Sequence, residues 1–257
     1  MLGKLRSFFR RNKPVYIDCY TTHGFIYEHA QPRPAKEFTP KWLKDIPVKL
    51  PVDGDGLSEG KTIRMCSGLN QLLDSGFIIP MWCDFKVKLG DKTHTHYKWL
   101  MSAEQLQASL HPAEQRGSYL PETEYSHVKL DNYWNFQCDE PIKFAMIDNT
   151  WMWDKPDDVI IPAGVIDFHY QHGAHVNIFF KRGDEDKEIF IKHGQPLVQL
   201  VPLTERPVVF RYHLLTEPEM RKINSLSGII KFIGSEYHKR KNPKYCPYST
   251  AKELFKK

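Results

Sequence analysis

The chain has 257 residues, of which 41% are hydrophobic and 13% aromatic, and its formal net charge at pH 7 is +5. This length and apolar content are enough for one main core and exclude a largely disordered chain. No run of about 18 apolar residues occurs, so we expect no membrane span, and Met1 to Lys13 lack the apolar stretch of a secretory signal.

The positive charge lies at the two ends of the chain. The first thirteen residues carry five positive charges and the last twenty carry a net six, which leaves the residues between them at a net −6. Basic ends can hold nucleic acid or another anionic partner, and they also occur as solvated tails.

The cysteines indicate the compartment. There are five of them, an odd number, with wide gaps and no C-x-x-C pair. This pattern is typical of reduced thiols, so we expect a cytoplasmic protein without disulfides.

The first part of the chain predicts a strand and then an extended arm. Val15 to Tyr20 is apolar and β-branched enough for a strand, whereas the prolines between Pro32 and Pro51 exclude regular structure over much of that stretch. Within it, Thr39 as N-cap and Pro40 as the first helical residue predict one short helix. The glycines of Asp53 to Gly60 predict an exposed loop.

The middle of the chain is predicted to be rich in β-structure. A short helix from Ser67 is expected to end at Gly76, which can take a left-handed conformation. Phe77 to Leu89 alternates like one strand, and a capping box at Ser102 predicts a second helix. From Val128 to Tyr212, short apolar runs alternate with turn residues, which is typical of a β-sandwich or jelly roll.

The last predicted element is a C-terminal amphipathic helix. Thr216 and Glu219 form a capping box, and apolar residues recur every three or four positions after it. We therefore predict a mainly β fold, a sandwich or jelly roll with a few short helices. Its three parts are an extended N-terminal arm with a basic start over 1–60, a β-rich core over 61–212, and the C-terminal helix and basic tail over 213–257.

Residues 164–203 contain two consecutive motifs. The segment Gly164-Val165-Ile166-Asp167-Phe168-His169-Tyr170 is followed by a predicted hairpin and then by Gly194-Gln195-Pro196-Leu197-Val198-Gln199-Leu200. This order resembles the core of the dUTPase and dCTP-deaminase superfamily, in which a Gly-apolar-Ile-Asp-x-x-Tyr segment precedes a Gly-x-x-apolar-x-Gln-Leu strand. The resemblance implies a dUTPase-like core for this part of the chain.

The same resemblance implies a nucleotide hydrolase. Asp167 would accept a proton from a Mg²⁺-associated water that attacks the α-phosphate, and Tyr170 and Gln199 would bind the substrate. The superfamily's Ala-Gly-x-Asp segment, its Arg-Ser-Gly phosphate grip and its Gly-rich closing arm have no counterpart in this sequence. The resemblance therefore implies a fold more directly than an active site.

A second resemblance covers more of the chain. The sequence looks like that of an uncharacterised protein family encoded by marine bacteriophages and some bacteria. The matching segments are Phe38 to Pro47, Thr62 to Gly68, Gly76 to Asp84, Gly164 to Asp167 and Gly194 to Gln199. Ser67 departs from the family, in which a proline usually follows the cysteine. This resemblance implies a phage or marine-bacterial origin, with the host cytoplasm or the virion as the place of action, and no established activity.

Three histidines lie close to Asp167 in the sequence. Imidazole and carboxylate groups are the ligands of zinc and non-haem iron sites, and a turn at Gln171 to Gly173 would gather His169, His172 and His175. Such a site would make the protein a cupin-like, metal-dependent oxygenase. The same residue types also occur as ordinary polar turn residues.

Three functions follow from these patterns, and we favour the first. It is a non-catalytic role in binding or assembly, with another protein or a second copy of the chain as partner, because the core is rich and no complete catalytic set is visible. The helix from Pro218 to about His238 and the basic tail after it would make the contact. The alternatives are the nucleotide hydrolase that uses Asp167 and the metal-dependent oxygenase.

Overall fold

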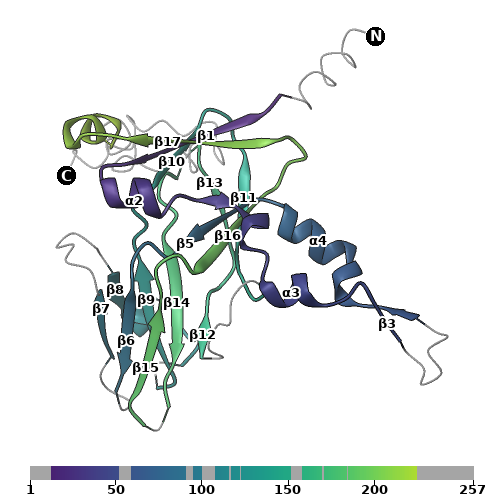
Figure 1. Cartoon of the computed structure of the whole chain (residues 1–257). Coiled ribbons are helices and arrows are strands. Elements are labelled where there is room, and N and C mark those ends of the chain that lie inside the picture. Colours follow the sequence, from purple (N-terminus) through teal and green to yellow (C-terminus); the bar gives the residue numbers. More distant parts are fainter. Residues whose placement is uncertain are drawn as a thin grey trace, which may run out of the picture.

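The computed structural model describes residues 13–51, 59–90, 95–99, 108–115, 117–121, 123–151, 158–169, 171–183 and 185–224. Most of the regular structure consists of strands and the helices are short, so the predicted mainly β fold is confirmed (Figure 1). No helix within these ranges is both long enough and apolar enough to cross a membrane.

Two antiparallel sheets form a sandwich at one end of the molecule (Figure 1). The first has the strand order β12-β14-β9-β8, with the bounds Val159–Ile160, Val176–Lys181, Tyr125–Leu130 and Ala108–His111. The second has the order β15-β6-β7, with the bounds Lys187–Ile191, Phe85–Leu89 and Thr95–Trp99. The inward side chains of the two sheets, such as Val87, Val128 and Ile178, belong to one buried core.

Two further sheets extend this core towards the other end of the molecule. One has the order β13-β11-β16-β5-β2, with the bounds Gly164–Asp167, Lys143–Asp148, Pro196–Pro202, Phe77–Pro80 and Arg33–Pro34. The other has the order β10-β1-β17, with the bounds Asn135–Cys138, Val15–Thr21 and Val208–Leu214. Phe210 of β17 stacks on Phe77 of β5 with 3.8 Å between ring centroids, which joins these two sheets.

Alternation of side chains explains which face each strand buries. In β6, Phe85, Val87 and Leu89 are fully buried, whereas the two lysines between them are not. Successive side chains of a strand point to opposite faces, so one face of β6 covers the core and the other meets solvent. Each buried side chain of this size stabilises the fold by about 1.5–3 kcal/mol.

The predicted single strand over residues 77–89 is wrong, because two strands form there, β5 in one sheet and β6 in another. The three residues 81–83 between them are all buried, which does not occur in a strand with one solvent face. Backbone hydrogen bonds from Met81 N to Gln195 O (2.7 Å) and from Gly194 N to Met81 O (2.8 Å) hold this crossing. Buried and less buried side chains alternate in β6 but not in β5, where the last three residues are all buried.

Two short helices follow their predicted signals. α3 (Lys41–Asp45) begins one residue later than predicted, with Pro40 at the N-cap, while Thr39 Oγ1 donates to Lys36 O instead. α4 (Ser67–Asp74) ends just before Gly76, whose φ of +74° lies in the left-handed region as predicted.

The C-terminal helix begins at its predicted capping box. Glu219 Oε2 accepts hydrogen bonds from Thr216 N at 2.8 Å and from Thr216 Oγ1 at 2.7 Å, and the helix is described as far as residue 224. The rest of this helix, the two basic ends and the helix predicted at Ser102 lie outside the described residues. α2 (Gly24–His29) was not predicted; it has no side-chain cap that would reveal its start.

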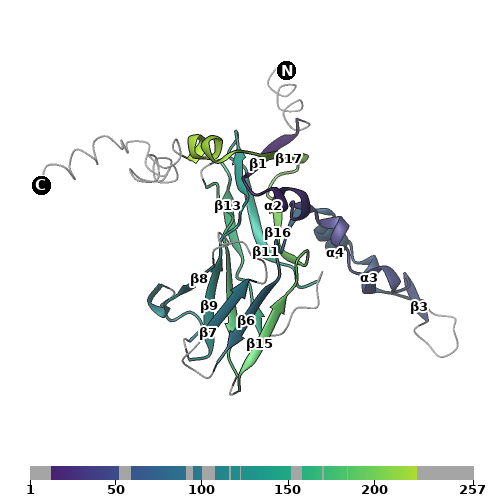
Figure 2. The ribbon, with the colours of Figure 1, turned by 60° about the vertical axis from the view of Figure 1, so that its left-hand side comes forward.

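The described residues 35–51 and 59–74 form an arm that projects from the body of the molecule, as Figures 1 and 2 both show. We call it the projecting arm; it contains η1 (Ala35–Phe38), α3, β3 (Lys49–Pro51), β4 (Glu59–Lys61), η2 (Ile63–Met65) and α4. A small second core, to which Leu43, Leu69 and Leu73 contribute, attaches it to Ile78 of β5. The boundaries differ from the predicted arm over 1–60, because β1 belongs to the main core.

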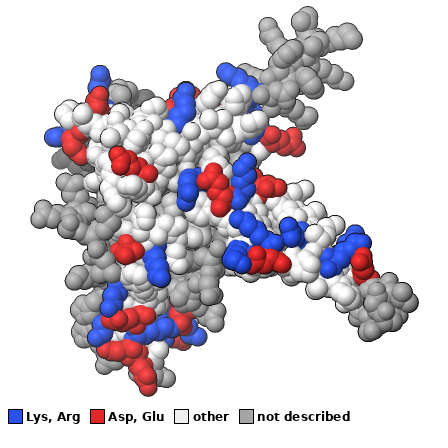
Figure 3. All heavy atoms as spheres, in the orientation of Figure 1, with Lys and Arg blue, Asp and Glu red and all other residues white. Residues whose placement is uncertain are grey.

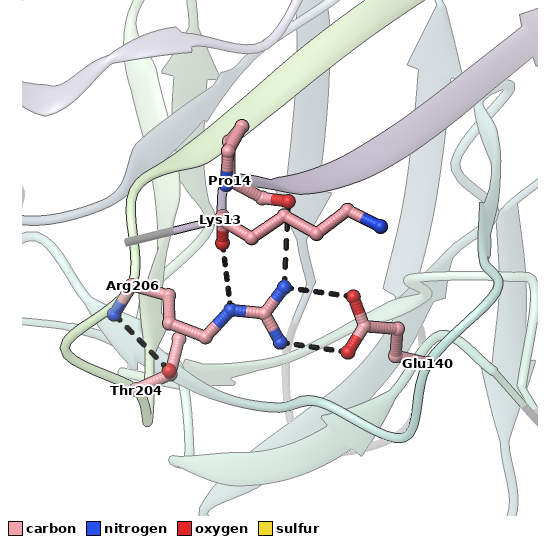
Figure 4. Close-up of polar contacts among 5 residues, drawn as sticks. All are labelled: Lys13, Pro14, Glu140, Thr204 and Arg206. Carbon is pink, nitrogen blue, oxygen red and sulfur yellow. Dashed lines mark hydrogen bonds and ion pairs between the residues drawn. The ribbon is translucent and has the colours of Figure 1, made fainter. Parts of the chain in front are cut away.

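Arg206 fastens the start of β1 to the two turns beside it (Figure 4). Its guanidinium donates to both carboxylate oxygens of Glu140, at 2.7 and 2.8 Å, and to the backbone oxygens of Lys13 at 2.8 Å and Pro14 at 3.4 Å. Two parallel hydrogen bonds to one carboxylate fix the guanidinium plane. The loop after β10, the turn before β17 and the residues before β1 are thereby held together.

The described cysteines differ in accessibility, and this leads to a first prediction. Cys66 is exposed, whereas Cys19, Cys83 and Cys138 are buried. Burial raises the pKa of the Cys83 thiol to about 12 and also raises the pKa of Cys19 and of Cys138. Because the thiolate is the reactive form, we expect iodoacetamide to label Cys66 in the folded chain and to leave the other three unlabelled. Peptide mass spectrometry measures the labelling, and rapid labelling of Cys83 without denaturant would contradict this structure.

Candidate functional site

Asp167 is the last residue of β13, and its polar groups hold the turn that follows. Its Oδ1 accepts a hydrogen bond from His169 N at 3.1 Å, and its backbone oxygen accepts one from Gln171 N at 2.9 Å. The side chain is partly exposed. Tyr170, the other residue expected beside a substrate, lies outside the described residues.

Gln199 lies inside the protein, 1% exposed. Its amide nitrogen donates to Leu72 O at 2.8 Å and to Ser75 O at 2.7 Å. The last carbonyl groups of a helix have no partners within the helix, so this amide serves as a cap for α4. The structure thus gives Gln199 a task that the superfamily resemblance did not imply, namely fastening the projecting arm to the sheet.

The three histidines of this segment are not brought together. His169 Nδ1 donates to Cys138 O at 2.8 Å, and His172 Nδ1 donates to Phe136 O at 3.0 Å, so both imidazoles face the backbone of β10. His175 instead contacts the carboxylate of Asp131, the residue that follows β9. Within the described ranges, no three His, Cys, Asp or Glu side chains lie close enough to hold a metal ion. The predicted zinc or iron site is therefore not assembled in this arrangement.

A pocket of about 430 Å³ opens beside β13. One of its walls is the polar face of the β8-β9-β14 sheet, where the register aligns Ser109 with Lys129 and Lys129 with Asn177. Its polar lining consists of His111, Lys129, Gln171, His175 and Asn177. Its other lining residues are Met146, Gly164, Val165, Ile166 and Gly173.

His127 lies on the same face of the sheet as Lys129, two residues away on β9, and contacts two residues of the lining. It is 9% exposed and stacks on Phe179, with 4.4 Å between ring centroids and 16° between the planes. Its ring centroid lies 4.8 Å from that of His111, and its Nε2 donates to Asn177 Oδ1 at 3.0 Å. These contacts fix one imidazole and one amide of the lining.

Asp131 fixes two more lining residues. Its Oδ1 lies 3.0 Å from His175 Nδ1 and 3.5 Å from Lys129 Nζ. Asp131 itself is not among the residues that line the pocket. Four polar side chains of the lining thus contact His127 or Asp131, neither of which lines the pocket.

His175 and the turn residue Gln171 were singled out from the sequence, whereas His111, Lys129 and Asn177 were not. On β9, Lys129 stands between the buried residues Val128 and Leu130, and on β14, Asn177 stands between Val176 and Ile178. This alternation was visible in the sequence. The register that places Lys129 beside Asn177 was not, because the two strands are joined by a long connection with no turn signal that sets their pairing.

A second feature is the apolar surface of the projecting arm. Its exposed large side chains are Trp42, Val48, Leu50, Ile63 and Met65. Trp42 also faces Trp151, which follows β11 in the body, with 6.3 Å between ring centroids. We call this set, with Trp151, the arm surface.

A third feature is an open apolar area on the sheet beside the arm. The register places Val165 of β13 next to Ala145 of β11, and Ala145 next to Val201 of β16. Val165 is 63% exposed, and Leu203, just after β16, is 55% exposed. We call these four residues the open sheet face. α4 covers the neighbouring part of the same sheet, over Gln199.

No protein-family model matches the sequence, and a comparison with curated proteins found no match either. Both family resemblances therefore stay predictions. The same holds for the nucleotide hydrolase, its Mg²⁺ and the role of Asp167 in it.

Proposed function

We propose that this protein works by self-association, in which the projecting arm of one copy docks on the open sheet face of another. The observation that supports the proposal is the group of exposed apolar side chains that forms the arm surface. Scattered exposed apolar residues are normal on proteins, but a group of them on one projecting element marks an interaction site. Here all of them except Trp151 belong to the described residues 35–51 and 59–74, which leave the body of the molecule (Figure 2).

The composition of the arm surface favours a protein partner. Trp42 is 45% exposed and Trp151 41% exposed, and aromatic side chains of this kind dominate the binding energy of protein interfaces. Two of the five lysines of the arm form ion pairs: Lys41 contacts Asp45, and Lys49 Nζ lies 2.6 Å from Glu59 Oε2. Figure 3 shows positive and negative side chains interspersed along the arm. Such a surface lacks the single-sign charge that a nucleic acid requires.

The open sheet face favours a second copy as that partner. It is a second apolar area of the same chain, and the arm of the same copy cannot cover it because the arm points away from the body. One copy therefore carries both halves of an apolar contact. When two such halves lie on different parts of one surface, copies can join by reciprocal exchange or head to tail.

The second prediction tests this contact with two variants and their mixture. Trp42→Glu places a charge in the arm surface, and Leu203→Glu places one beside the open sheet face. We expect the full chain to associate in solution, and each variant to weaken association about 30-fold or more, since loss of an interface anchor costs about 2 kcal/mol or more. Mixing the two variants restores association, because one intact arm still meets one intact face. Analytical ultracentrifugation measures all four samples.

The control is Phe190→Glu, on the solvent face of β15. Phe190 is 41% exposed, close to the exposure of Trp42, but belongs to neither surface. This variant should associate like the unmodified chain. A monomeric unmodified chain, or two variants that stay monomeric when mixed, would rule out the arm-to-face contact.

A further inference from the structure

The pocket beside β13 has an unusual charge balance for this protein. Residues 14–237 carry a net charge of −6, yet no Asp or Glu is among the described residues that line the pocket. Its lining instead offers the ammonium group of Lys129, the imidazoles of His111 and His175, and the amides of Gln171 and Asn177. The Lys129 ammonium also lies 3.5 Å from Asp131 Oδ1, which is outside the lining, and the side of the ammonium that faces the pocket is accompanied by hydrogen-bond donors. Such an arrangement is a suitable environment for an anion.

The opposite side of the pocket is apolar. Met146, Val165 and Ile166 line it, on the sheet that faces the polar strands. Its volume of about 430 Å³ lies within the usual range of about 300–1,000 Å³ for small-molecule pockets. A bare inorganic ion would contact only the polar side and leave this apolar side without a partner.

The polar side chains are held in place before any ligand arrives. His127 positions Asn177, and Asp131 positions His175 and Lys129, as described above. Gly173 also contributes, because a Cβ atom at this position would lie 2.8 Å from His175 Nε2, so the imidazole would have to move from its present position. Fixed side chains lose less freedom on binding, which favours affinity.

We propose that this pocket binds a small organic anion, a phosphate or carboxylate group attached to an apolar or aromatic portion. The anionic group would lie against Lys129 and Asn177, and the apolar portion against Val165 and Ile166. Val165 belongs to both the pocket and the open sheet face, so a bound ligand and a docked arm would meet the same side chain. The two proposals are still tested separately, because neither Trp42 nor Leu203 lines the pocket.

Isothermal titration calorimetry of the full chain tests the proposal with four probes: phenyl phosphate, benzoate, inorganic phosphate and neutral benzyl alcohol. We expect at least one aromatic anion to bind about tenfold tighter than benzyl alcohol and than inorganic phosphate, since a hydrogen bond to a charged group contributes about 1.5–3 kcal/mol. The stronger of phenyl phosphate and benzoate identifies the anionic group.

Two variants and a control connect binding to this pocket. Lys129→Met keeps the length of the side chain but removes the charge, and Gly173→Ala displaces His175 while retaining Lys129; each should weaken binding about tenfold. Lys181→Met, on the exposed end of β14 and outside the pocket, should bind like the unmodified chain. Circular dichroism confirms that each variant is folded.

Three results would overturn the proposal. They are the absence of binding by both aromatic anions, equal affinity of the anions and benzyl alcohol, and equal affinity of the Lys129→Met and Lys181→Met variants. Equal binding of inorganic phosphate and phenyl phosphate would overturn the part that assigns an apolar portion to the ligand.

Discussion

Replacing Gly76 with alanine lowers the free energy of unfolding by about 3 kcal/mol, for two reasons that add. The φ of +74° costs any side chain with a Cβ about 1–2 kcal/mol. The added Cβ would also lie 2.0 Å from Leu200 O of β16, so the backbone of the sheet has to shift, at a cost of about 1–3 kcal/mol. At this chain length, thermal unfolding should show a Tm about 6–12 °C lower.

Gly68→Ala is the matched control for this substitution. Gly68 lies in α4, only eight residues earlier, and a Cβ there meets nothing within 4 Å. Alanine is favoured over glycine within a helix by about 0.5–1 kcal/mol, so this variant should melt at the same temperature or slightly higher. If Gly76→Ala melted like Gly68→Ala, the close approach of α4 and β16 would be wrong.

Replacing Gln199 with glutamate has a comparable effect, because it removes the donor that caps α4 and buries a negative charge. Leu72 O and Ser75 O would both face a carboxylate, which can only accept hydrogen bonds. Leu72 O keeps its hydrogen bond from Ser75 N, but Ser75 O loses its partner, at a cost of about 1–3 kcal/mol, and the buried negative charge adds to this. We therefore expect a loss of about 3 kcal/mol or more at neutral pH. Chemical denaturation of the full chain measures this loss.

The loss should depend on pH in a definite direction. Burial raises the pKa of the new carboxyl group in the folded state above its usual value of about 4.3. The protonated form is neutral and can donate to one carbonyl, so the defect is smallest below this value. It grows as the pH rises through the unfolded pKa towards the folded one. Unmodified Gln199 does not titrate and adds no such dependence.

Gln71→Glu is the control for Gln199→Glu. Gln71 lies on the exposed side of the same helix, where an added charge changes stability by about 0.5 kcal/mol or less. Normal stability of Gln199→Glu would contradict the capping role. It would return Gln199 to the list of residues available to a substrate.

The features that were predicted correctly depend on local signals. The capping box at Thr216, the left-handed Gly76 and the β-rich run that starts at Val128 each depend on a few neighbouring residues. The change of sheet after Pro80 depends on contacts with residues near Gly194, more than a hundred positions away. Local patterns cannot reveal such pairings, since they are fixed by the register of distant strands.

The same limit explains the outcome for the candidate site. The segment that holds Asp167 and Gln199 was selected for its motif, and the structure uses these two residues for a turn and a helix cap. Lys129 and Asn177 carried no motif, because a lysine and an asparagine on alternating strands are common surface residues. Only the pairing of β9 with β14 makes them neighbours in one pocket.

The parallel pairing of β1 with β17 affects how the chain reaches its fold. Val15 pairs with Val208 and Thr21 with Leu214, so almost the whole described chain lies between the two partners. During synthesis β1 leaves the ribosome before β17. The edge of β1 that pairs with β17 therefore remains open until β17 has been made. Contacts of such long sequence separation form slowly, and an open strand edge invites pairing with other chains. The newly made chain is therefore most exposed to aggregation just before β17 closes the sheet.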